Sequence, residues 1–78
     1  MIKEGKTYFF AGDFISCDME GVEHNFIGEY FTVLEVKEVM GLYAKCRMDL
    51  DASEVLFPVE ELEEMVEWGI VVDTEEMY

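Results

Sequence analysis

The sequence of 78 residues predicts a single domain, spanning residues 1–78, that is mainly β with one short acidic helix near the C-terminus. Between Leu42 and Met48, apolar residues alternate strictly with polar or charged ones, which is the period of a half-buried strand. Pro58 and Gly69 bracket an apolar stripe at helical spacing, made of Val59, Leu62, Met65 and Val66. A domain this short buries only roughly 60% of its unfolded surface, and the hydrophobic share of 51% offsets that thin core.

The first half of the chain contains two stretches typical of strands. Residues 7–11 are aromatic and β-branched and lie between Gly5 and Gly12. Residues 12–28 predict a long loop or ragged hairpin that packs on the core, because they mix turn residues with scattered apolar ones. Residues 30–36 are largely apolar on both faces, so we expect a buried central strand.

The second half begins with the alternating strand at residues 42–48. We expect a polar turn at residues 49–53 and a short strand at residues 55–57 to follow it. The helix then begins at Pro58, where the missing N–H costs little, and ends at Gly69. A last strand is predicted at residues 70–72, and the remaining residues form an acidic tail.

The net charge of -14 is unevenly distributed along the chain. Residues 1–47 hold 8 acidic and all 5 basic residues, whereas residues 48–78 hold 11 acidic residues and no basic one. Such a field repels nucleic acid and anionic membranes and attracts cationic surfaces. We therefore expect no direct DNA or RNA binding and no membrane binding, because nucleic-acid binding requires a basic footprint.

The expected location is the cytoplasm. No apolar run approaches the ~18 residues that span a bilayer, and residues 1–6 contain no apolar signal core. Cys17 and Cys46 are then expected to be reduced thiols. A disulfide between them stays open as the alternative if the chain is exported.

Cys17, His24 and Cys46 are the chain's Cys and His residues, and they do not predict a zinc site. A closed zinc site needs four ligands, usually with closely spaced cysteines, and these three are irregularly spaced. Cys17 and His24 share one predicted loop, but nothing else in the sequence supplies the rest of a nucleophilic site. We expect no enzymatic activity.

Asp49, Asp51 and Ser53, followed by Glu60, imitate the ligand spacing of a calcium-binding loop. Such a loop needs glycine at its sixth position for the sharp turn, and Glu54 stands there. We therefore interpret this segment as an acidic turn between strands, and we expect no bound metal and no cofactor.

The predicted helix concentrates negative charge. Five glutamates fall within eight residues, with no Lys or Arg to relieve them: Glu60, Glu61, Glu63, Glu64 and Glu67. Their five like-charge pairs three and four residues apart cost together about 1–2.5 kcal/mol at low salt. A cationic partner would convert that cost into binding energy. A role in solubility and adaptation to a host with high intracellular salt both predict the same excess of acidic residues. Partner binding, solubility and salt adaptation therefore all stay open as interpretations.

Three segments carry a resemblance to a known family: residues 5–8, residues 28–36 after a long loop, and residues 56–64. Together they resemble small SH3-like β-barrel proteins, many of them encoded by bacteriophages. That resemblance implies a barrel of about five strands, with a long loop between the first two strands and a brief turn or helix after the fourth. It implies no particular function.

Two hypotheses for function follow. The first is a stoichiometric inhibitor whose acidic surface occupies the nucleic-acid-binding site of a host nuclease, polymerase, repair enzyme or CRISPR effector, in the host cytoplasm if a phage encodes it. The residues expected to contact that basic surface are Asp49, Asp51, Glu54, Glu60, Glu61, Glu63, Glu64, Glu67, Asp73, Glu75 and Glu76. Trp68 and Tyr78 are candidate aromatic anchors, although we expect Trp68 in the core.

The alternative is an accessory interaction module of a phage or bacterium that binds through an apolar patch or a strand edge, including as a homodimer.

Overall fold

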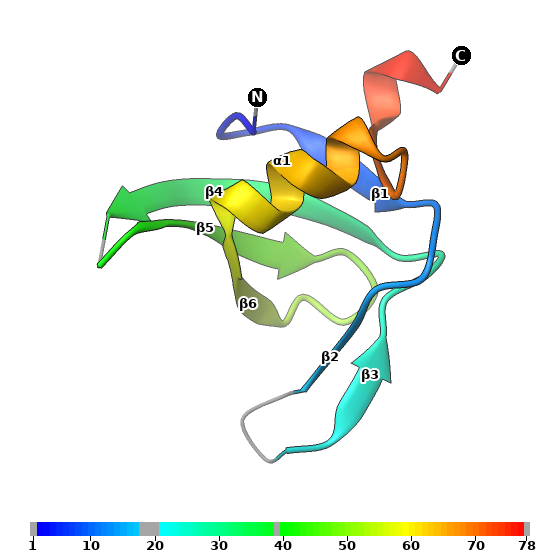
Figure 1. Ribbon diagram of the computed structural model, residues 1–78, viewed down its shortest axis with the longest axis horizontal. Coiled ribbons are helices and arrows are strands. Elements are labelled where there is room, and N and C mark those ends of the chain that lie inside the picture. Colours follow the sequence, from blue (N-terminus) through cyan, green and yellow to red (C-terminus); the bar gives the residue numbers. More distant parts are fainter. Residues whose placement is uncertain (1, 18–20, 39, 78) are drawn as a thin grey trace.

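The computed structural model describes residues 2–17, 21–38 and 40–77 (Figure 1). Its elements in chain order are β1 (Thr7–Phe10), β2 (Ile15–Cys17), β3 (Glu23–Asn25), β4 (Tyr30–Glu38), β5 (Leu42–Met48), β6 (Glu54–Pro58), α1 (Val59–Glu67), β7 (Val71–Asp73) and the 3-10 helix η1 (Thr74–Glu76). The expected mainly β fold with one short α-helix is confirmed. Instead of a simple tail, the C-terminal residues contribute Asp73 to β7 and one 3-10 turn.

Strands β6-β5-β4-β1-β7 form one sheet in that order, and β2 and β3 form a separate pair. Every pairing is antiparallel. Within the described residues, β6 and β7 are the two edges of the larger sheet and do not pair with each other, so the sheet is not closed into a barrel. Helix α1 connects the two edges along the chain and lies across one face of the sheet (Figure 1).

Strand β4 is central in the sheet, but only one of its faces is buried. Phe31 and Val33 are fully buried, whereas Tyr30 and Leu34 are exposed. The expectation of a strand buried on both faces is therefore wrong. A register shift between Val33 and Glu35 places Leu34 in a bulge, and bulges bend a strand and increase its twist.

The core lies between the sheet and α1. Phe10 is at its centre, with its ring centroid 4.9 Å from that of Phe31 and 5.9 Å from that of Phe57. The helix contributes Val59, Leu62 and Met65. The remaining buried apolar residues are Ile2, Tyr8, Phe26, Val33, Ala44, Cys46, Met48 and Val71. No described residue with a polar or charged side chain is buried.

The β2–β3 hairpin projects from the body of the molecule (Figure 1). Its base is held by Phe14 and Phe26, whose rings lie 5.5 Å and 5.7 Å from that of Phe10. The predicted hairpin packing on the core is thus present at the base, while Ile15 is exposed. Among the elements described, no helix is both long enough and apolar enough to cross a membrane.

Candidate functional site: the acidic face of helix α1

Helix α1 ends where the sequence predicts, for an identifiable reason. Gly69 has a φ of +79°, in the left-handed region that favours glycine. The N–H of Ile70 donates to the carbonyl of Met65 at 2.8 Å, and that of Gly69 to Val66 at 3.2 Å. These two bonds form a Schellman motif. At the other end, Pro58 precedes the helix in an extended conformation and gives no side-chain cap.

The amphipathic pattern of α1 separates a buried face from an acidic one. Leu62 is fully buried against the sheet. The opposite face carries four exposed glutamates at positions i, i+3, i+4 and i+7: Glu60, Glu63, Glu64 and Glu67. Within the described part of the chain, none of the four makes an ion pair. Their charge therefore stays uncompensated and faces solvent.

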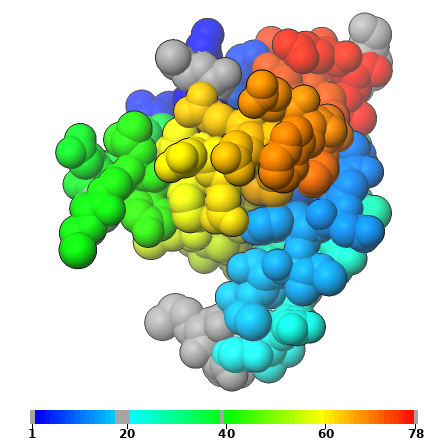
Figure 2. Space-filling model, in the orientation of Figure 1, coloured from blue at the N-terminus to red at the C-terminus, as the bar shows by residue number. Residues whose placement is uncertain are grey.

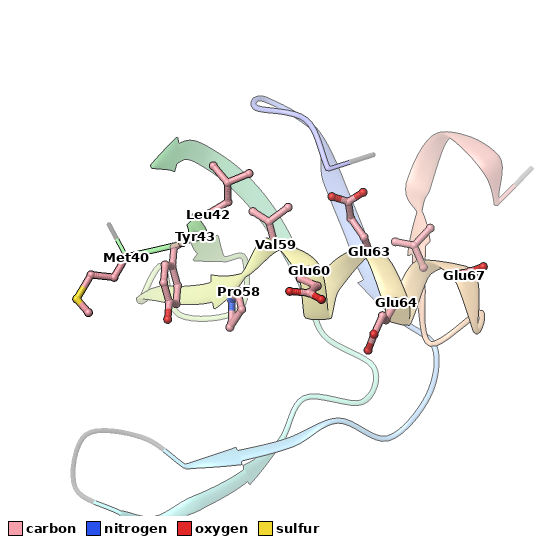
Figure 3. Close-up of a pocket in the computed structure, with 11 residues that line it drawn as sticks. Met40, Leu42, Tyr43, Pro58, Val59, Glu60, Glu63, Glu64 and Glu67 are labelled. Atoms are coloured by element: carbon pink, nitrogen blue, oxygen red, sulfur yellow. The ribbon is translucent and has the colours of Figure 1, made fainter. Parts of the chain in front are cut away.

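These four glutamates line a groove of about 840 Å³ (Figure 3). Its other walls come from the turn between β4 and β5 and from the adjoining ends of β5 and β6. The apolar end of the groove is defined as Met40, Leu42, Tyr43 and Pro58, and it lies at the N-terminal end of α1. Figure 3 shows the glutamates extending away from it along the helix. Val59 and Val66 complete the apolar lining. Figure 2 shows the helix on the surface, flanked by that turn.

Three of the other predicted acidic residues are paired within the protein. The Nζ atom of Lys6 lies 2.6 Å from Oδ2 of Asp73 and 3.2 Å from Oε2 of Glu75. The hydrogen bond from Lys6 holds the pKa of Asp73 below its usual range, and the N–H of Glu75 adds to that effect. The same contact with Asp73 raises the pKa of Lys6. Glu54 is paired with Lys45 at 3.2 Å.

The remaining predicted acids lie away from the groove. Asp51 accepts hydrogen bonds from the Oγ and N–H of Ser53 at 2.6 and 3.0 Å, and the hydroxyl contact is the main cause of its lowered pKa. Asp49 accepts a bond from the Thr32 hydroxyl at 3.2 Å. Glu61 and Glu76 are exposed, and neither lines the groove. Of the predicted contact residues, the groove therefore brings together only the four glutamates of one helix face.

Trp68 is 69% exposed, so the expectation that it lies in the core is wrong. It follows Glu64 by four residues and therefore continues the exposed side of the helix. Tyr78, the other candidate anchor, lies outside the described residues.

The two thiols lie in different environments. Cys17 is exposed on β2, whereas Cys46 is fully buried on β5, and neither forms a disulfide. Burial raises the pKa of Cys46 to about 12, so its thiol is protonated at neutral pH. His24 lies with Nε2 2.6 Å from Oε2 of Glu29. In the ranges 2–17, 21–38 and 40–77, no three His, Cys, Asp or Glu side chains are grouped as metal ligands.

The apolar end of the groove is the part that sequence reasoning missed. The sequence shows Met40 and Gly41 only as the residues that precede the alternating strand, and Leu42 as the first apolar residue of that strand. Leu42 is 53% exposed because it lies at the end of β5, beyond the cover of α1. The available signal was Met40 itself, an apolar side chain at a turn.

Comparison of the chain with protein-family models, with curated proteins and with solved structures finds no match. The geometry and charge of the groove are therefore the basis for assigning a function.

Proposed function

We propose that the protein is a stoichiometric, non-enzymatic inhibitor that occupies the nucleic-acid-binding site of a host nuclease, polymerase, repair enzyme or CRISPR effector. The observation that carries this proposal is the uncompensated row of Glu60, Glu63, Glu64 and Glu67 on the exposed face of α1. Carboxylates placed along a rigid helix present negative charge in a fixed arrangement, as a phosphate backbone does.

The spacing of the four glutamate charges on α1 is comparable to that of phosphates in duplex DNA. Glu60 and Glu67 are seven residues apart, which is about 10 Å along a helix at ~1.5 Å per residue. Four charges over that length approach the density of duplex DNA, one per ~1.7 Å of axis, within a factor of two. A basic site that binds phosphates would therefore meet a comparable local field.

The pairing of other acids supports a local contact surface rather than a uniform coating. Asp73, Glu75 and Glu54 are partly neutralised by lysines of the same chain. The chain has only 5 basic residues, and no described one pairs with the glutamates of α1. Solubility requires only net charge and does not require that the helix remain unpaired.

We propose further that the fold is a variant of the SH3-like barrel, with the sheet left open between β6 and β7. Two features support this. The β2–β3 hairpin is inserted between the first and second strands of the five-stranded sheet, β1 and β4, and α1 follows its fourth strand, β6. These are the positions at which the resembling family carries its long loop and its brief helix.

A second candidate function is an accessory interaction module that binds through an apolar patch or strand edge, including as a homodimer. Strand β6 is an edge of the sheet, and Leu56 on it is 59% exposed. Unpaired edges accept additional strands. Binding through this edge would resist salt, whereas binding through α1 would not.

The experiment is a pull-down from bacterial lysate at low and high salt, repeated with charge-reversed protein. In the test variant, Glu60→Lys, Glu63→Lys and Glu64→Lys are combined. The matched control combines Asp13→Lys, Glu23→Lys and Glu35→Lys, which changes the net charge equally at exposed acids outside the groove lining. We expect the test variant to lose the captured partner, the control to retain it, and duplex DNA to compete for it. Equal retention by both variants, without competition by DNA, contradicts the proposal.

A further inference from the structure

We propose that the groove beside α1 binds a short basic segment that is headed by one bulky apolar side chain. The apolar side chain would occupy the apolar end of the groove, and the following lysines or arginines would lie along the glutamates. This inference rests on the proposed function and specifies which part of a basic partner the site recognises.

Two apolar side chains at the apolar end of the groove are exposed. Met40 is fully exposed and has a φ of +56°, in the left-handed region where glycine or asparagine is favoured. Leu42, two residues later, is 53% exposed. A fully exposed apolar side chain buries no surface in the free protein, but it contributes contact area once a partner covers it.

The acidic end complements that contact with charge. Glu60 lies next to Pro58 and Val59 in the groove lining, and Glu63, Glu64 and Glu67 follow (Figure 3). The groove therefore changes from apolar to acidic along its length. A segment with the opposite order, apolar head and cationic remainder, matches both ends at once.

The groove is open to solvent, and its volume leaves room for part of a projecting segment. At about 840 Å³ it can hold a few side chains, because small-ligand pockets measure roughly 300–1,000 Å³. A second copy of this chain does not supply such a segment. Its five basic residues are Lys3, Lys6, Lys37, Lys45 and Arg47, and no two of them are adjacent.

The test uses two synthetic fluorescent peptides of equal charge. One has a phenylalanine followed by four arginines, and the other has glycine in place of the phenylalanine. Fluorescence anisotropy at low and high salt measures binding of each peptide to the full chain. We expect the phenylalanine-headed peptide to bind at least 10-fold more tightly, and that ratio to persist at high salt.

Matched variants assign the two contributions. Met40→Asn with Leu42→Thr should bring the two peptides to equal affinity, whereas Leu50→Asn with Leu56→Thr, which removes two exposed leucines outside the groove, should not. Glu64→Gln should weaken both peptides at low salt, whereas Glu61→Gln, on the helix but outside the groove lining, should have a smaller effect. Circular dichroism confirms that each variant is folded.

Equal affinity of the two peptides, or no binding of either, overturns this inference. Equal affinity of the two peptides would leave the proposed function standing, because that proposal needs only the glutamates of α1. The proposed function fails instead if the variant with three reversed charges still captures its partner from lysate. A dimer that Met40→Asn with Leu42→Thr converts to monomer would show that a second copy fills the groove, and would also overturn the inference.

Discussion

The Nζ atom of Lys6 lies 2.6 Å from Oδ2 of Asp73, although the two residues are 67 positions apart in the sequence. Lys6 directly precedes β1, and Asp73 ends β7, which pairs with β1. Asp73 also accepts a bond from the N–H of Glu75 at 3.0 Å and so caps η1. The carboxylate of Asp73 therefore links β7 to the start of β1 through Lys6 and also stabilises the 3-10 turn that follows β7.

Asp73→Asn should lower the thermal midpoint by a few degrees at pH 7. Asparagine retains the cap but loses the charge that Lys6 binds. The pKa of Asp73 is lowered in the folded protein. The carboxylate therefore stabilises the fold fully above its pKa in the unfolded chain, about 3.9, and this stabilisation is lost as pH falls through the pKa of the folded state. The pKa of Lys6 is raised in the folded protein. The charged amine therefore stabilises the fold fully below its pKa in the unfolded chain, about 10.4, and this stabilisation is lost as pH rises through the pKa of the folded state.

Thermal melts from pH 2 to 11 measure this difference. The gap between the original protein and Asp73→Asn should be constant between about pH 5 and 10 and should shrink on both sides of that window. Glu76→Gln, at an exposed acid of η1, is the control and should show no gap. A gap that is unchanged at pH 2 would mean that the charge of Asp73 is not the cause.

Cys17 and Cys46 should differ in reactivity by orders of magnitude. The exposed Cys17 thiol is accessible, whereas Cys46 is fully buried and its pKa is raised to about 12. Because the thiolate is the nucleophile, a thiol reagent at pH 8 should titrate one group rapidly in the folded protein and the second only on unfolding. Equal rates for both thiols without denaturant would contradict the burial of Cys46. Cys17→Ser should abolish the fast phase alone.

Phe10→Ala should remove a large part of the free energy of unfolding. Phe10 is fully buried, and its ring contacts those of Phe14, Phe26, Phe31 and Phe57. Truncating such a residue costs about 3–5 kcal/mol, against a total of about 4–12 kcal/mol for a domain of this size. Phe9→Ala, on the opposite face of the same strand, should cost less than half as much. Urea denaturation followed by circular dichroism compares the two.

Glu64→Gln should stabilise the free protein at low salt. The change removes three like-charge pairs, with Glu60, Glu61 and Glu67, which together cost about 0.6–1.5 kcal/mol in an isolated helix. The gain should fade with added salt, because the Debye length falls from about 30 Å at 0.01 M to about 10 Å at 0.1 M and about 3 Å at 1 M, so the repulsion between these neighbouring charges is increasingly screened. Urea denaturation at 10 and 500 mM NaCl measures it. A destabilised variant would indicate that Glu64 has a favourable contact in the folded protein.

The elements governed by local rules were predictable from the sequence. The alternation at residues 42–48 matches β5 to the residue, and the Pro58 to Gly69 bracket contains α1. Each of these signals acts within a few residues, because side-chain period and backbone φ are local properties. The prediction for Trp68 was wrong, although the same local rule applies to it, since it lies one helical turn after Glu64 on the same side.

The arrangement that forms the groove was not predictable, because it depends on contacts between distant segments. Met40 and Leu42 meet the glutamates of α1 only after β5 pairs with β6 and the helix crosses the sheet. The ion pair of Asp73 with Lys6 likewise depends on β7 returning to β1. The residue pattern within one segment carries no information about contacts with a distant segment. The eleven predicted contact acids therefore include both carboxylates that are paired in the structure and carboxylates that are not.

The position of β1 has a consequence for how the chain reaches this fold. One edge of β1 pairs with β4 and the other with β7, which is formed by Val71–Asp73. Closing a loop of more than sixty residues costs chain entropy before the final pairing repays it, so topologies of this kind fold slowly. While the chain is being synthesised, Tyr8 and Phe10 lie on a strand with an open edge until the last strand has been made. The interval between the synthesis of β1 and that of β7 is therefore the period in which a nascent chain is most exposed to wrong strand pairing.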